Sequence, residues 1–111
     1  MTVTHVKRIA ELNDLCRTSM GLAGRWVITE GVASLPPAAQ AEILAKVRMF
    51  DDFSRDNDPY RERDFGAFDH AGKKIFWKID YYDPTLTQGS EDPADPKKTA
   101  RVLTILLAEE W

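Results

Sequence analysis

The stretch that decides the fold is KIFWKIDYY, residues 74–82. In it Ile75, Trp77, Ile79 and Tyr81 alternate with Phe76, Lys78, Asp80 and Tyr82. Because successive side chains of a strand point to opposite faces, this period of two predicts a strand with one apolar and one amphipathic face. We therefore expect Asp80 and Tyr82 to lie at a partly wet surface.

The residues before this strand predict a hairpin. Residues 64–69 supply a first short strand, and His70-Ala71-Gly72-Lys73 supply a polar turn. Glycine in that turn makes a positive φ available, as tight hairpin turns require. Residues 25–29 are short, aromatic and β-branched, and they predict a third strand.

Two helices are predicted in the N-terminal half. Apolar residues recur at helical spacing through residues 6–16, which indicates an amphipathic helix. Pro36 and Pro37 suit the first turn of a second helix, where a missing amide hydrogen costs nothing. Its apolar stripe consists of Ile43, Leu44, Val47 and Phe50.

The C-terminal segment, residues 97–110, admits two interpretations. Asp95-Pro96 resembles a helix N-cap followed by proline at the first helical position. A helix would present one apolar side, made of Val102, Leu103, Leu106 and Leu107. A strand is the alternative, because the same segment is rich in β-branched residues. We expect the helix.

These elements predict a single α+β domain, residues 1–111, in the order α-β-α-β-β-α. Its expected architecture is a small antiparallel sheet of about three strands covered by helices. A hydrophobic content of 43% and a charged content of 30% are ordinary globular values, so we do not expect global disorder.

The charge is distributed unevenly along the chain. Residues 51–95 carry 12 acidic and 6 basic side chains, although the whole chain has a net charge of only −3. A protein that binds duplex nucleic acid gathers Lys and Arg on one face to displace counterions. The acidic middle therefore disfavours direct nucleic-acid binding, with the Arg55, Arg61, Arg63 cluster as the feature that keeps this alternative open.

Cysteine content and hydropathy indicate the compartment. Cys16 is the only cysteine, which excludes an internal disulfide and a cysteine-rich zinc site. No apolar run approaches the ~20 residues needed to cross a bilayer, and residues 1–14 lack the apolar core of a signal peptide. We expect a cytoplasmic protein without a membrane partner.

The carboxylates of the acidic middle are the first candidate for a site. Clustered carboxylates bind divalent cations, supply a general acid or base, or form a partner-binding surface. They are also common as capping and turn residues in a solvated loop. The EF-hand pattern is not met, because Arg61 stands where that loop needs glycine. We expect a partner-binding surface made of Asp51, Asp52, Asp56, Asp58, Tyr60, Glu62, Asp64, Asp80, Tyr82 and Asp83.

No catalytic constellation is visible in the sequence. His5 and His70 are expected far apart at the surface, and Cys16 lies on the apolar side of its helix without a base nearby. Ser90 lacks the flanking residues of a nucleophile elbow. The dense aromatic residues of the hairpin favour core packing and a protein interface over base stacking. We therefore predict no catalytic residue, no metal and no cofactor.

Several motifs, taken in order, resemble a known family. They are Phe50-Asp51-Asp52-Phe53, Asp56-Asn57-Asp58-Pro59-Tyr60, Asp64-Phe65-Gly66-Ala67-Phe68, Trp77-Lys78-Ile79-Asp80-Tyr81-Tyr82-Asp83, and Asp92-Pro93-Ala94-Asp95-Pro96 with Arg101-Val102-Leu103-Thr104-Ile105. The chain resembles a bacterial domain-of-unknown-function family, number 3768 in that series. The resemblance implies a small accessory protein of plasmids, phages and integrated elements, and it brings no activity with it.

One departure from the family pattern bears on function. Family-like sequences have glycine and histidine where this chain has Arg61 and Arg63. If that histidine were catalytic, this chain would have lost it, so the departure disfavours an enzyme and leaves an interaction role untouched.

These observations lead to two hypotheses of different class. The first is a non-enzymatic factor of a mobile element that docks on a host protein or protein complex. Its concrete form is an anti-CRISPR or anti-restriction inhibitor of a nucleic-acid-binding defence complex, which an acidic surface would attract. The alternative is a hydrolase or nuclease-like enzyme that uses Asp56, Asp58, Asp64 and Asp80 around a divalent metal.

Overall fold

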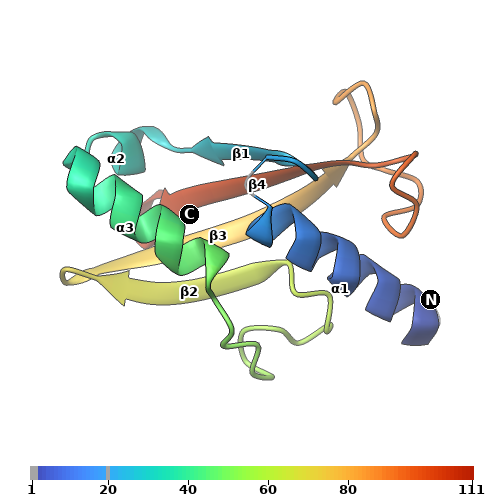
Figure 1. The fold of residues 1–111 in the computed structure, drawn as a ribbon, viewed down its shortest axis with the longest axis horizontal. Helices are drawn as coiled ribbons and strands as arrows, with labels where there is room; N and C mark the ends of the chain where they lie inside the picture. The colour runs from blue at the N-terminus through green and yellow to red at the C-terminus, as the bar shows by residue number, and fades with distance from the viewer. Residues whose placement is uncertain (1–2, 20) are drawn as a thin grey trace.

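The structure is a computed structural model in which residues 3–19 and 21–111 are described (Figure 1). Three α-helices and four strands follow one another, and a short 3-10 segment ends the chain. In chain order they are α1 (Val3–Thr18), β1 (Arg25–Ile28), α2 (Glu30–Ala33), α3 (Pro37–Arg48), β2 (Phe65–His70), β3 (Lys73–Tyr82), β4 (Ala100–Leu107) and η1 (Ala108–Glu110).

The strands form one mixed sheet in the order β1-β4-β3-β2. β2 with β3, and β3 with β4, pair antiparallel, whereas β1 pairs parallel to β4. β3 and β4 are therefore the central strands, and β1 and β2 are the two edges. The α+β class is confirmed, while the expectation of a purely antiparallel sheet of about three strands is wrong.

The C-terminal segment is the largest correction. Residues 97–110 were expected to form a helix, but residues 100–107 form β4, a central strand. Alternate residues of β4 are buried on the core face of the sheet, from Arg101 through Leu103 and Ile105 to Leu107. The same residues also fit the helical spacing noted above. They form a strand because both edges of β4 pair with neighbouring strands, β1 and β3.

The predicted hairpin and the second predicted helix are confirmed. β2 and β3 flank a two-residue turn in which Ala71 and Gly72 have φ values of 50° and 80°. Pro36 is the N-cap of α3 and Pro37 its first residue, and Ile43 and Val47 of its stripe are fully buried. The short helix α2 was not expected; the Oγ of Thr29 accepts a hydrogen bond from the Val32 amide and caps it.

The core lies between the sheet and the helices α1 and α3, which both lie in front of the sheet in Figure 1. Cys16 comes from α1, Ile43 and Val47 come from α3, and the rest comes mainly from β3 and β4. Across the sheet, Phe65 and Phe76 pack with Trp111, whose ring centroid is 5.8 and 5.6 Å from theirs. Among the described residues, no helix is long and apolar enough for a transmembrane span.

Trp77 of β3 is the largest fully buried side chain. Its indole lies against Gly66 of β2, and a Cβ placed on Gly66 would meet the indole nitrogen and lie 2.7 Å from Cζ of Phe50. Phe50 and Phe53 contact the same indole edge-to-face, with centroids 5.5 and 6.2 Å away. Gly66 therefore lets β2 approach a ring that also holds the segment after α3.

We predict that Gly66→Ala lowers the free energy of unfolding by about 1–3 kcal/mol, the usual cost of overpacking a core. The matched control is Gly89→Ala, because a Cβ there meets only the carbonyl oxygen of Tyr81 at 3.9 Å, an ordinary contact. Urea denaturation of both variants measures the difference. Equal stability of Gly66→Ala and the parent chain would contradict this packing.

Candidate partner-binding loop

Residues 49–64 connect α3 to β2 and contain most of the acidic residues expected in the site. A connection without secondary structure is uncommon beyond about 12–15 residues, and such a segment is usually either functional or a disordered linker. We call it the acidic loop. It is anchored at its start by Phe50 and Phe53, whose rings pack edge-to-face on each other and on Trp77.

Arg17 of α1 fastens the acidic loop to the helices. Its guanidinium donates to the carbonyls of Val47 and Arg48 at 3.2 and 2.7 Å, and so binds the C-terminal end of α3. The same group stands 5.2 Å from the ring centroid of Phe53 and 5.7 Å from that of Trp77. One buried cation therefore joins α1, α3, the sheet and the loop.

Asp58 organises the middle of the acidic loop. It is only 7% exposed, and its Oδ1 accepts a hydrogen bond from the Arg63 amide at 2.9 Å. Its amide donates to the Ser54 carbonyl at 2.7 Å, and its carbonyl accepts from the Arg61 amide at 3.2 Å. Asp58 is thus a turn-forming residue inside the loop and does not offer its carboxylate to a partner.

Arg61 and Arg63 adopt left-handed backbone conformations, with φ values of 61° and 56°. Glycine reaches this region without steric cost, whereas other residues rarely do. The glycine that the family resemblance implies in place of Arg61 fits this geometry. Arg63 also forms an ion pair with Asp14 at 3.0 Å and lies 4.7 Å over the Phe53 ring, which fixes the end of the loop.

With its ends and its middle held, the acidic loop exposes four of the predicted site residues. Asp51, Asp52 and Asp56 have exposed side chains, and Tyr60 is 78% exposed. Asp52 Oδ2 accepts a hydrogen bond from the Asn57 amide group at 3.2 Å, which orients it. The loop therefore combines carboxylates in solvent with a large exposed aromatic ring, a composition typical of a contact surface.

Glu62 is held by a buried polar network beneath the loop. Its Oε1 accepts from the Tyr81 hydroxyl at 2.7 Å, and its carbonyl accepts from the Asn13 side chain at 2.9 Å. Asn13 also donates to the Tyr81 hydroxyl at 2.8 Å and accepts from Arg101 Nε at 2.7 Å. Asn13 is fully buried, and Arg101 is 6% exposed.

The importance of this network was not recognised in the sequence. Asn13 lies four residues after Ile9 and three before Cys16, both fully buried, so it stands on the buried stripe of α1. A polar residue on such a stripe needs a buried partner, and this is the signal that points to the network. The sequence around Arg101 points to the network less clearly, because a single charged residue in an apolar strand is also typical of an exposed position.

Asp64 lies close to other carboxylates at the end of the acidic loop. Burial first, and then the negative charge of Glu62, raises the pKa of Asp64 from 3.8 to about 6; Asp58 and Asp80 contribute further. Even so, no group of three or more described His, Cys, Asp or Glu residues is arranged to hold a metal ion.

Asp80, Tyr82 and Asp83 belong to β3 and the turn after it, and of the three only Asp80 acts on the charge of Asp64, at the end of the acidic loop. Asp80 and Tyr82 are half-buried on the amphipathic side of β3, as expected, and Asp80 forms an ion pair with Lys78 at 2.9 Å. Asp83 begins the next turn, where its Oδ1 accepts from the Thr87 amide at 3.1 Å and from the Thr85 hydroxyl at 2.9 Å. The structure therefore does not bring these three residues and the acidic loop into one uniformly acidic surface.

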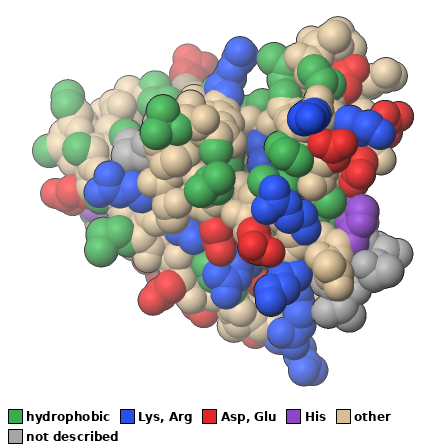
Figure 2. Space-filling model, turned by 45° about the vertical axis from the view of Figure 1, so that its right-hand side comes forward, with side chains coloured by type: hydrophobic (Ala, Val, Ile, Leu, Met, Phe, Trp, Pro, Cys, Tyr) green, Lys and Arg blue, Asp and Glu red, His purple; other side chains and the backbone are tan. Residues whose placement is uncertain are grey.

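Basic side chains interrupt the acidic ones on the molecular surface. Figure 2 shows Lys and Arg interspersed with Asp and Glu over the face that it presents. Arg55, Arg61 and Arg63 all have exposed side chains within the acidic loop. The loop is therefore a mixed-charge surface with an acidic excess.

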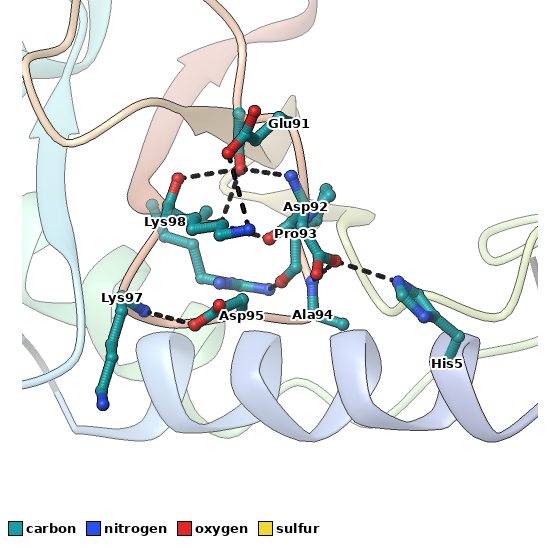
Figure 3. A network of polar contacts seen from close by, with 11 residues as sticks. His5, Glu91, Asp92, Pro93, Ala94, Asp95, Lys97 and Lys98 are labelled. Atoms are coloured by element: carbon teal, nitrogen blue, oxygen red, sulfur yellow. Dashed lines mark hydrogen bonds and ion pairs between the residues drawn. The ribbon is translucent and has the colours of Figure 1, made fainter.

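The two histidines are held at separate places, and each has an acidic partner distant in sequence. His5 Nε2 lies 3.0 Å from Asp92 Oδ1, which also accepts from the Ala94 amide at 3.1 Å (Figure 3). His70 Nε2 lies 3.3 Å from a Glu42 oxygen. The His5 contact joins α1 to residues 90–99, whose turns are closed by their own Ser, Thr and Asp side chains.

Cys16 is a core residue, as expected. It is fully buried, and burial raises the pKa of its thiol to about 11. A thiol in this environment stays protonated at neutral pH and is a poor nucleophile.

Comparison with known proteins defines the family. Residues 28–110 match the family described as "Protein of unknown function (DUF3768)", and the chain belongs to that family. No curated protein and no solved structure matches the chain significantly. The matched range starts at the end of β1 and includes the acidic loop, the hairpin and β4.

The raised pKa of Asp64 predicts a pH-dependent stability. The ionised form of Asp64 is less favourable in the folded chain than in the unfolded chain, so its ionisation destabilises the fold. This destabilisation is absent below about pH 4, where the group is protonated in both states, and complete above about pH 6, where it is ionised in both. We therefore expect Asp64→Asn to raise the free energy of unfolding by on the order of 1–2 kcal/mol at pH 7.5, and to change it little at pH 4. Urea denaturation at both pH values measures this.

Asp83→Asn provides a control of opposite sign. Partial burial opposes its ionisation, but hydrogen bonds from the Thr87 amide and the Thr85 hydroxyl outweigh this and lower its pKa. The Asp83 substitution should therefore cost more stability at pH 7.5 than at pH 4. An Asp64→Asn variant that gains no stability at pH 7.5 would show that Asp64 is not electrostatically disfavoured.

Proposed function

We propose that this chain is a non-enzymatic protein-binding factor that contacts its partner through the exposed residues of the acidic loop. The single observation that carries this proposal is the display of Asp51, Asp52, Asp56 and Tyr60 by an irregular segment with buried anchors. A surface that is ordered before association loses less conformational entropy on binding. Tyrosine is enriched in interfaces because its ring offers apolar area and its hydroxyl a hydrogen bond.

More specifically, we propose a small bacterial mobile-element protein that inhibits a host defence system, as anti-CRISPR and anti-restriction proteins do. Such systems bind nucleic acid through basic surfaces, to which exposed carboxylates are complementary. Interspersed arginines make recognition of a particular protein surface a better match than general mimicry of DNA. The proposal places the protein in the cytoplasm, where such a complex would be met.

A metal-dependent hydrolase is the second candidate, and one observation favours it. Asp58, Glu62, Asp64 and Asp80 are close enough for their charges to raise the pKa of Asp64, and a bound cation would relieve that repulsion. Asp56, which belonged to the expected metal set, has an exposed side chain on the acidic loop. The candidate is therefore reduced to the carboxylates around Asp64.

The protein-binding proposal predicts a charge-sensitive partner. The triple variant Asp52→Lys/Asp56→Lys/Tyr60→Ala changes exposed residues only, so it should fold normally and lose at least tenfold of its partner in affinity capture from a bacterial lysate. The control is Glu30→Lys/Glu109→Lys, which makes the same change of charge at exposed positions on α2 and η1. Equal capture by the parent chain, the triple variant and the control variant would contradict a role of the acidic loop.

The two candidates predict different responses to divalent cations. Under the protein-binding proposal, Mg²⁺, Mn²⁺ and Ca²⁺ at millimolar concentration should leave the melting temperature unchanged. A metal site would instead raise it with cation concentration, because a ligand stabilises the state that binds it. A rise that Asp64→Asn abolishes would support the hydrolase and count against the first proposal.

A further inference from the structure

No strand of the described sheet pairs with the outer edge of β2, where Lys46 donates to the Asp69 carbonyl. β2 lies at the end of the sheet and pairs with β3 alone. An edge strand presents a row of unpaired backbone groups to which another chain can add.

The hydrogen-bonding pattern of the hairpin gives the orientation of these groups. His70 and Lys73 flank the two-residue turn, where the first pair is hydrogen-bonded, and pairs then alternate along the strands. The Ile79 amide donates to the Asp64 carbonyl at 2.8 Å, which agrees with this alternation at the other end. The amides of Phe65, Ala67 and Asp69 therefore point away from β3.

A groove of about 470 Å³ runs along this edge, between β2 and the C-terminal end of α3. Phe50, Phe68, Ala67 and Met49 supply its apolar lining, and Met49 is 74% exposed. Ala67 and Asp69, whose amides point outward, also line it. An extended segment laid against β2 would thus meet both backbone partners and apolar contacts.

The charge of the groove indicates the chemistry of that segment. Asp51, Asp52 and Asp69 line the groove and are exposed, and no ion pair involves any of them among the described residues. The Asp69 side chain lies on the face of β2 opposite Phe68, so Asp51 and Asp52 are the carboxylates on the groove side. Among the described residues of the lining, Lys46 is the only cation, and its amino group contacts the Asp69 carbonyl and His70 Nδ1 at 3.3 and 3.0 Å. The groove is therefore acidic, and a basic partner is complementary to it.

We propose that a basic, extended peptide segment of the partner protein adds to β2 as a fifth strand, with its cationic side chains at Asp51 and Asp52. This inference rests on the proposed function and names the class of segment that the acidic loop recognises. Backbone pairing supplies affinity in such strand addition, while the side chains supply specificity. Asp51 and Asp52 belong to both the acidic loop and the groove, which makes the two surfaces continuous.

The probe is a blocked octapeptide of alternating valine and arginine, and its dissociation constant is measured by titration calorimetry. We expect it to bind the full chain at least tenfold more tightly than a valine–glutamate peptide, with affinity falling as salt rises. Ala67→Pro should weaken binding at least tenfold, because proline removes an outward amide without touching the β2–β3 hydrogen bonds. Asp51→Asn/Asp52→Asn should also weaken it, and Glu30→Gln/Glu109→Gln should not.

A second measurement avoids dependence on the proline variant. The same peptide, N-methylated at two adjacent central residues, loses an amide donor on each of its edges and should bind the parent chain at least tenfold more weakly. Equal affinity for the methylated and unmethylated peptides, or for the arginine and glutamate peptides, would overturn strand addition. So would a concentration-dependent dimer of the parent chain that Ala67→Pro abolishes, because the edge would then accept a second copy.

Failure of this inference is distinguishable from failure of the proposed function. If the triple variant Asp52→Lys/Asp56→Lys/Tyr60→Ala loses the captured partner while Ala67→Pro keeps it, the acidic loop binds without strand addition. That result overturns the fifth strand and leaves the protein-binding proposal intact. Loss of the partner in both variants supports both.

Discussion

The contact between the indole of Trp77 and Gly66 is the constraint on which the rest of the structure depends. Because Gly66 has no Cβ, β2 passes close to a ring that is fully buried between the sheet and the helices. Phe50 and Phe53 pack on the same ring, and the Arg17 guanidinium stands over Phe53 and Trp77. One side chain therefore joins the hairpin, α1 and the segment that leaves α3.

This constraint gives the acidic loop its character. A segment with so many carboxylates would be mobile if it were merely solvated. Here the Phe53 ring anchors one end in the core, Asp58 closes the central turns, and Arg63 and Glu62 tie the other end to α1 and Tyr81. The exposed carboxylates and Tyr60 are thus displayed by a scaffold, as in many binding loops that are carried by rigid elements.

The sequence was informative where one periodicity dominated. The alternation through β3, the glycine of its turn and the paired prolines before α3 each had one physical interpretation, and the structure agrees with them. The segment from residue 97 onward carried two periodicities, and only the neighbours β1 and β3 decide between them. The parallel pairing of β1 with β4 joins residues far apart in the chain, and no local pattern announces it.

The site was predictable in composition but not in detail. The sequence shows where the carboxylates are, yet Asp51 and Asp58 look alike in it, and only the three-dimensional turn makes Asp58 a buried acceptor. The position of Asp80 on β3 and of Asp83 in the following turn likewise follows from the sheet. Arg101 of β4 donates a hydrogen bond to the side chain of Asn13 on α1, so each buried polar group is satisfied by the other. Neither residue could therefore be interpreted alone from the sequence.

The central claim is that the acidic loop is ordered before any partner binds, and backbone ¹⁵N relaxation of the isolated protein tests it most directly. A loop ordered in this way gives order parameters for residues 51–63 near those of the strands, about 0.8 or higher. Values below about 0.6 through residues 54–62, next to rigid strands, would contradict it, because the loop would then have to be ordered by its partner.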